Sequence, residues 1–168
     1  MAICNDNFNG CFGGPYYPRP IFNCGATGTC GGGNNIVNPA QTGEWGFFAT
    51  QNNQVSSLGV IPVNTVSKSG SAISQDQSGV INITSGNYLV NYSANVNSNA
   101  NPVEIALELN GEILPYSSIS QSGNGDLKTL FSSVIVSASS NSIIKMLNQT
   151  NDDVVILNAN LVVTKLLN

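Results

Sequence analysis

Histidine is absent from this sequence of 168 residues, and charged residues make up only 8% of it. Soluble domains carry about 25% charged residues, so the polar surface must consist mainly of Asn, Ser, Thr and Gln. The five basic residues, Arg19, Lys68, Lys128, Lys145 and Lys165, are scattered along the chain, and the net charge is -4. Without a basic patch to neutralise phosphates, we expect no nucleic acid partner. So little charge also does little to oppose self-association.

Long hydrophobic runs are missing as well. No stretch approaches the roughly 18 apolar residues of a membrane-spanning helix, so we expect no membrane partner. The opening "MAICNDNFNG" has neither the basic nor the apolar region of a signal peptide. We therefore expect synthesis in a cytosol without a signal peptide. Disulfides seldom persist in that compartment, unless the producing cell later lyses and exposes the protein to oxidising surroundings.

Cysteine is confined to the N-terminal segment and is absent from the rest of the chain. Structural zinc sites usually contain C-x-x-C pairs, and this segment has none. The pattern favours disulfides and leaves zinc and free thiols as alternatives. Any disulfide must join N-terminal segments, within one chain or between chains. The disulfide candidates are Cys4, Cys11, Cys24 and Cys30.

The composition changes near residues 34 to 44, which predicts a connector over residues 1–37 and a folded domain over residues 38–168. The first part is rich in Gly, Pro, Cys and aromatic residues without a period, whereas the second contains short alternating segments between turns. In "NYLVNYSANV" and "VEIALEL" apolar residues recur at every second position, which indicates half-buried strands. Asn110-Gly111 is a strong hairpin signal. Further strands are expected at 45–50, 60–66, 71–75, 79–84, 129–138, 142–148 and 153–166, the last of them central because it is the most apolar.

Many short strands with regular turns and no convincing helix predict an all-β sandwich or jelly roll. The order of "IPVNT", "GSAIS", "SGNYLVNYSANVN", "IALELNGEILP" and "ANLVVTKLL" resembles the C-terminal domain of the Bacillus collagen-like exosporium glycoprotein, from about Trp45 to Leu167. The resemblance implies a jelly roll of the tumour-necrosis-factor and complement-head type that forms trimers on spore surfaces. In place of a long collagen-like region stands only "GATGTCGGG", which is too short for a triple helix. A cysteine-bearing connector followed by a jelly roll is also similar to the plan of bacterial endospore appendage subunits.

The connector contains apolar side chains suited to docking on a neighbouring subunit. Its prolines keep "PYYPRP" extended and lower the entropy lost on docking. The docking candidates are Tyr16, Tyr17, Ile21 and Phe22. The strands of the domain carry more large apolar residues than one core needs, and the trimer contact candidates among them are Tyr88, Tyr92, Phe131 and Leu161.

Catalysis has little support in this sequence, and we expect no enzyme and no cofactor. The commonest general base is missing, and no base accompanies the cysteines. Glu104 and Glu108 are expected on an outward strand face, where they would be solvated. The Asp152-Asp153 pair and the "GNGD" turn ending at Asp126 offer oxygens to calcium, although turn chemistry also explains them. Three glycosylation sequons, at Asn82, Asn91 and Asn148, are expected by chance in a chain so rich in Asn and Ser.

These features favour a structural subunit of a spore-surface fibre, in which trimers stack head to tail through their N-terminal connectors. A head-to-tail contact that does not close generates a filament. The expected partners are further copies of this chain and other proteins of the spore surface, exosporium or coat. The alternative is a trimeric adhesive or ligand-binding head, such as a lectin-like sandwich that displays the loop at residues 121–127.

Overall fold

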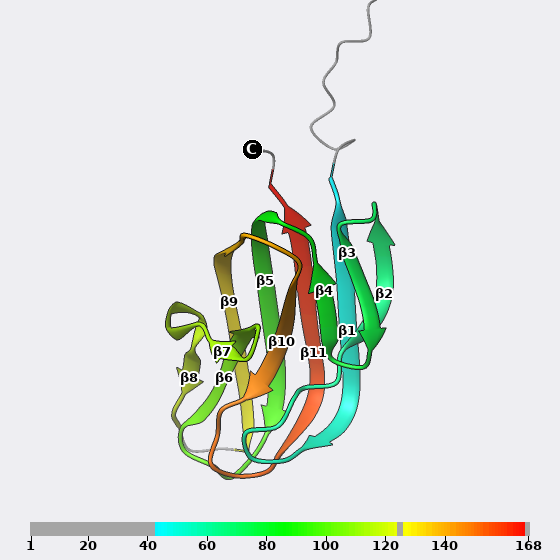
Figure 1. Ribbon diagram of the computed structural model, residues 1–168. Coiled ribbons are helices and arrows are strands. Elements are labelled where there is room, and N and C mark those ends of the chain that lie inside the picture. The colour runs from blue at the N-terminus through cyan, green and yellow to red at the C-terminus, as the bar shows by residue number, and fades with distance from the viewer. Residues whose placement is uncertain (1–42, 124–125, 167–168) are drawn as a thin grey trace, which may run out of the picture. The chain divides into compact units, whose positions relative to one another are not determined.

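A computed structural model describes residues 43–123 and 126–166, which form two antiparallel sheets packed face to face (Figure 1). Sheet A has the strand order β2-β1-β11-β5-β9, and sheet B has the order β3-β4-β10-β6-β7, with β8 also paired to β6. The predicted all-β jelly roll is confirmed. The elements are β1 Trp45–Val55, β2 Asn64–Ser69, β3 Ile73–Gln77, β4 Val80–Ile83, β5 Gly86–Asn97, β6 Val103–Leu109, β7 Glu112–Ile113, the 3-10 helix η1 Pro115–Ser117, β8 Ile119–Gln121, β9 Leu127–Ala138, β10 Ser142–Asn148 and β11 Val154–Lys165.

The strands with clear alternation match their predictions closely. Strands β6 and β10 have the predicted bounds, and Asn110-Gly111 forms the turn between β6 and β7. Strand β11 lies between β1 and β5 in sheet A, which confirms the prediction that the most apolar segment is a central strand. Period-two patterning therefore located the strands that contribute most to the core.

The predicted strand at 60–66 is wrong at its start. Val60 makes only an isolated bridge to Leu147, and β2 begins at Asn64. The reason is Pro62, which has no N–H to donate to a ladder, and the Val63 N–H instead bonds the Ile61 carbonyl at 2.9 Å. The short β8 and η1 were not predicted.

The core lies between the sheets and consists mainly of apolar side chains. Phe48, Tyr88, Leu107 and Leu161 are among its fully buried side chains. Gly46 is required beside Phe48, because a Cβ at this position would lie 2.6 Å from the Phe48 ring. The predicted boundary between residues 37 and 38 lies outside the described residues and stays a prediction.

Candidate assembly surface

The outer side of sheet A consists of side chains that alternate with the core residues of four strands. Strand pairing aligns these side chains in rows that cross β1, β11, β5 and β9 in that order. We call this surface the A face. Its rows are Trp45, Thr164, Leu89, Ile135; then Phe47, Val162, Asn91, Ser133; then Ala49, Asn160, Ser93, Phe131; then Gln51, Asn158, Asn95, Thr129.

The A face carries no charge among the residues just named. Amide and hydroxyl side chains alternate on it with aromatic and aliphatic ones, and Phe131 is 79% exposed. Side chains within the fourth row are joined by hydrogen bonds between neutral groups, such as Asn95 Nδ2 to Asn158 Oδ1 at 3.1 Å. Depletion of charge with enrichment of aromatic residues distinguishes the buried centre of a protein interface from ordinary surface.

Charged side chains lie elsewhere on the described part of the chain. Lys145 Nζ and Glu108 Oε1 are 2.7 Å apart on the outer side of sheet B. Lys165 Nζ lies 3.5 Å from Glu44 Oε2, where β1 begins and β11 ends. The few charged side chains are therefore unevenly distributed, and none of the residues named in the rows of the A face is charged.

A hollow of about 350 Å³ lies in the middle of the A face. Its apolar lining residues are Val162 of β11 and Phe131 of β9, on either side of β5, and the small Ser93 of β5 lies between Asn160 and Phe131 in its row. Ser133 of β9 also lines the hollow, and Asn91 and Asn160 supply amide groups to it. The hollow exists because two serines occupy positions between larger side chains.

The four predicted trimer contact residues separate into two groups. Tyr88, Tyr92 and Leu161 are 0%, 3% and 0% exposed and belong to the core of the single chain. Phe131 alone of the four is exposed, on the A face. The large apolar side chains of the A face are other residues, such as Leu89, Ile135 and Val162.

Tyr92 connects the two sheets through its hydroxyl. It donates to the Ser117 carbonyl of η1 and also bonds Ser132 of β9. Burial raises the pKa of the Tyr92 hydroxyl above its ordinary value of 10.0, and the hydrogen bonds to Ser132 and Ser117 act in the opposite direction. The neutral phenol is thus the form that the folded domain favours.

We expect this tyrosine to make the domain sensitive to alkali. The folded pKa exceeds that of the unfolded chain, so its contribution is fully present below about pH 10 and is lost as the pH rises towards the folded pKa. Urea midpoints measured between pH 8 and 11 should fall more steeply for the wild type than for Tyr92→Phe. At pH 8 the free energy of unfolding of Tyr92→Phe should be about 1 kcal/mol lower than that of the wild type, because the variant lacks the hydrogen bond. Parallel curves would contradict this assignment.

The predicted connector lies outside the described residues. This applies to the disulfide candidates Cys4, Cys11, Cys24 and Cys30, and to the docking candidates Tyr16, Tyr17, Ile21 and Phe22. Their pairing and docking stay predictions.

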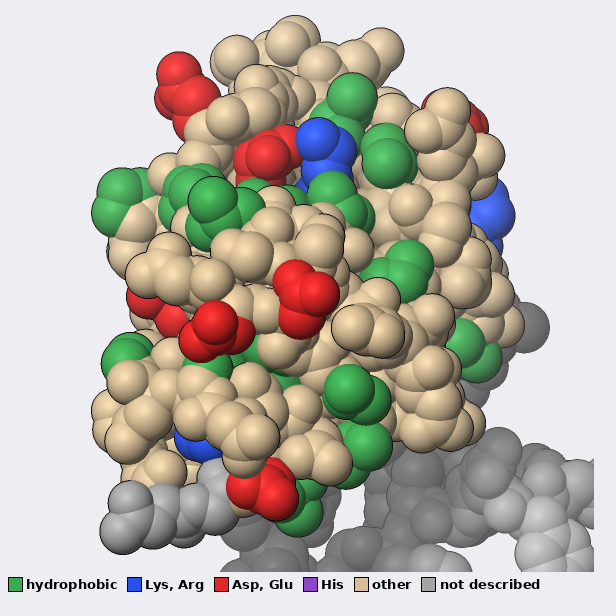
Figure 2. Space-filling view, turned by 90° about the horizontal axis from the view of Figure 1, so that it is seen from below, with side chains coloured by type: hydrophobic (Ala, Val, Ile, Leu, Met, Phe, Trp, Pro, Cys, Tyr) green, Lys and Arg blue, Asp and Glu red, His purple; other side chains and the backbone are tan. Residues whose placement is uncertain are grey.

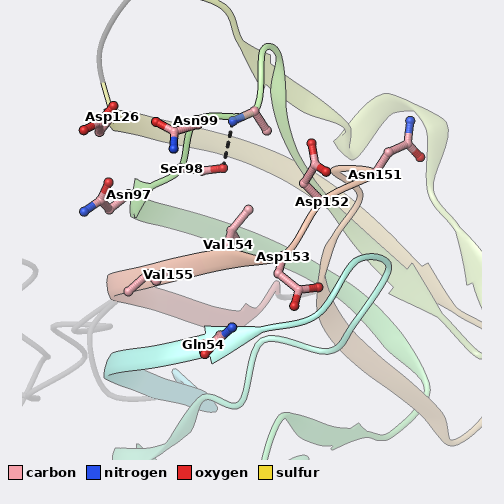
Figure 3. A pocket seen from close by; sticks show the side chains of 11 residues that line it. Gln54, Asn97, Ser98, Asn99, Asp126, Asn151, Asp152, Asp153, Val154 and Val155 are labelled. Atoms are coloured by element: carbon pink, nitrogen blue, oxygen red, sulfur yellow. Dashed lines mark hydrogen bonds between the residues drawn. The ribbon is translucent and has the colours of Figure 1, made fainter.

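The end of the sandwich opposite the start of β1 carries a second, polar hollow of about 870 Å³. Figure 2 shows this end, where acidic side chains stand among neutral ones. The structure brings together there the Asp152-Asp153 pair and Asp126, but their carboxylates point in different directions (Figure 3). Within residues 43–123 and 126–166, no three His, Cys, Asp or Glu side chains are grouped so as to hold a metal ion.

The Asn148 sequon has a structural use. Asn148 is fully buried, and its Nδ2 donates to the carbonyls of Ser56 at 2.9 Å and Asp152 at 3.1 Å. Its Oδ1 accepts from the Thr150 N–H at 3.0 Å. The side chain therefore joins the β1–β2 and β10–β11 connections and is inaccessible to a modifying enzyme in the folded domain.

Sequence reasoning missed two other buried polar residues. Lys128 is 3% exposed, and its Nζ donates to the Ser98 carbonyl at 2.9 Å. Ser117 is fully buried, and its Oγ donates to the Leu114 carbonyl at 2.7 Å while accepting from the Leu107 N–H at 2.8 Å. The inward position of Lys128 follows from the alternation of β9, which could have revealed it. Ser117 had no comparable signal.

No helix among the described residues is long and apolar enough to cross a membrane.

No protein-family model matches this chain, and neither does any curated protein sequence. Solved structures do match it. Eiger TNF from S. frugiperda is similar with a TM-score of 0.64 and 14% identity, over 75% of this chain and 94% of that one. Murine APRIL at pH 8.5 is similar with a TM-score of 0.60 and 13% identity, over 73% of this chain and 100% of that one. The globular domain of zebrafish complement 1qA protein is similar with a TM-score of 0.50 and 10% identity, over 74% of this chain and 98% of that one. The chain thus has a jelly-roll fold of the tumour-necrosis-factor and complement-1q type.

Proposed function

We propose that the chain is a structural subunit that forms trimers through its A face and is joined into a spore-surface fibre by its N-terminal segment. The main support for a trimer is that the rows of the A face contain no charged residue. A monomer in water gains nothing from keeping Trp45, Phe47 and Val162 on the same outer face as Phe131, whereas an interface buries them. The likeness to tumour-necrosis-factor-type folds agrees with this oligomer but supplies only the fold.

The fibre rests on the separation of cysteines from the folded domain. All four cysteines precede residue 31, whereas the strands begin at Trp45. A disulfide in this chain thus cannot cross-link the sandwich core. It can only join N-terminal segments, and between chains such a bond would link subunits. The spore surface is proposed as the location only because the sequence motifs resemble those of the exosporium glycoprotein and appendage subunits.

A lysine on the A face tests the trimer. Val162→Lys places a charge at the centre of the proposed interface, where an unpaired buried charge costs about 3 to 5 kcal/mol. In a chain truncated to residues 38–168, light scattering should show trimers for the wild type and monomers for Val162→Lys. The matched control is Ile143→Lys, because Ile143 is a 37% exposed strand residue on the outer side of sheet B. A truncated wild type that remains monomeric at micromolar concentration would contradict the proposed trimer.

The polar hollow at the far end favours a second function, a trimeric adhesive or ligand-binding head. Asp126, Asp152 and neutral amides such as Asn97 line it, and they offer hydrogen-bonding groups to a polar ligand. Negative-stain microscopy of the full chain distinguishes the two functions. Long fibres support the structural subunit, and discrete trimers support the head.

A further inference from the structure

A threefold ring needs two different contact surfaces on each subunit. Its interfaces are heterologous, so a patch on one copy meets a different patch on the next. The A face supplies one patch, and the second must come from another part of the domain. The largest side chain exposed elsewhere among the described residues is Tyr116 of η1, which is 62% exposed.

Tyr116 stands at the edge of the sandwich next to β9. The segment that follows β7 projects from this side (Figure 1), and η1 packs against β9, the outermost strand of sheet A. The side chain is therefore displayed beyond the border of the A face and not on it. This is the position that a contact with a neighbouring copy requires.

The turn that carries Tyr116 is held rigidly. Pro115 precedes it, and the following Ser117 is fully buried and bonds Leu114 and Leu107 through its hydroxyl. The Tyr92 hydroxyl also holds the Ser117 carbonyl. An exposed aromatic on a fixed turn loses little conformational entropy on docking.

We infer that Tyr116 of one copy inserts into the hollow of the A face on the next copy, an inference that rests on the trimer proposed above. The apolar walls, Phe131 and Val162, match the ring of a tyrosine. The amides of Asn91 and Asn160, which also line the hollow, match its hydroxyl, which needs a hydrogen-bond partner when buried. Neither the hollow nor η1 carries a charge that would oppose the contact.

Paired cysteines test the contact in the full-length chain after Cys4, Cys11, Cys24 and Cys30 are replaced by Ser. Tyr116→Cys combined with Ser93→Cys should give covalent trimers on non-reducing gels after treatment with a short bifunctional thiol cross-linker, because an inserted ring places the two Cα atoms farther apart than the roughly 7 Å that a disulfide spans. Each subunit would be linked to the next around the ring. The matched control combines Tyr116→Cys with Ser78→Cys, since Ser78 is exposed in the β3–β4 turn of sheet B. The control should give no covalent trimer.

Removal of the Tyr116 ring gives a second measurement. Trp45 is the only tryptophan of the chain and lies on the A face, so its emission reports on burial of that face. Loss of an aromatic side chain at the centre of an interface raises the dissociation constant about 30-fold or more. In Tyr116→Ala, the concentration at which subunits dissociate on dilution should therefore rise by at least this factor. Tyr116→Phe should change it only a few-fold, because the ring remains.

The outcomes separate this inference from the trimer itself. Trimers without cross-links above the control, together with unchanged dissociation of Tyr116→Ala, would overturn the contact and leave the trimer intact. Ser93→Phe fills the hollow and should weaken the trimer as Tyr116→Ala does. If it abolishes fibres while trimers persist, the hollow belongs to the N-terminal segment and the inference is wrong. A monomeric wild type would defeat the proposed function.

Discussion

Asn148→Asp is expected to destabilise the domain by at least about 3 kcal/mol at neutral pH, since each orphaned buried group costs about 1 to 3 kcal/mol and a buried charge costs more. The substitution keeps the shape of the side chain and removes its two N–H donors. One carboxylate oxygen would then face the carbonyls of Ser56 and Asp152, while the other would still accept from the Thr150 N–H. Urea midpoints of wild type and variant should differ accordingly.

Acid should reduce this difference. Burial without a cation raises the pKa of the introduced carboxyl above that of an unfolded chain, so the penalty is present at neutral pH and shrinks as the pH falls through the folded pKa. Asn148→Leu lacks the charge, so its loss should not depend on pH in this way. The control is Asn141→Asp, an exposed position in the β9–β10 turn, where a change within about 0.5 kcal/mol is expected. Equal midpoints for Asn148→Asp and Asn141→Asp would contradict the role of Asn148.

Deleting residues 1–35 is expected to abolish fibres without unfolding the domain. Every described strand begins at or after Trp45, and the core residues lie between Phe48 and Val163. The truncated chain should therefore keep its β circular dichroism and its thermal transition. Electron microscopy should show no fibres, because the proposed connector is missing. Identical fibres from the truncated chain would show that the connector has another location.

The matched control keeps the segment and removes only its thiols. With Cys4, Cys11, Cys24 and Cys30 replaced by Ser, fibres should still form at room temperature, because docking of apolar side chains needs no disulfide. They should resist heat and detergent less well, because a cross-link contributes about 2 to 4 kcal/mol. Mass spectrometry of wild-type fibres that found the four thiols free, or paired only within one chain, would contradict the interchain cross-link.

The sequence predicted the strands well because alternation is a local property. In β5 it placed Tyr88 and Tyr92 on one side and Leu89 and Asn91 on the other, but it could not say which side is inward. Both sides of β9 and β11 contain apolar residues, such as Leu130 and Phe131, or Leu161 and Val162. Tyr88, Tyr92 and Leu161 were therefore proposed as contacts although they are core residues.

The A face itself depended on strand register. Its top row joins Trp45, Thr164, Leu89 and Ile135, from four strands that are far apart in the chain. No window of the sequence contains this row, and one residue of slip in a strand would exchange its two faces. The hollow between Ser93 and Ser133 was invisible for the same reason.

Strand β1 also determines how the domain responds to mechanical tension. The N-terminal segment leads directly into Trp45, and β1 is hydrogen-bonded to β2 on one side and to β11 from Trp45 to Val55 on the other. A pull along the axis of β1 loads these bonds in parallel, as shear, whereas a pull across the sheet would open them one after another. Forced unfolding depends on the rate of unfolding and not on equilibrium stability. A pull applied along β1 would thus load the domain in its stronger direction.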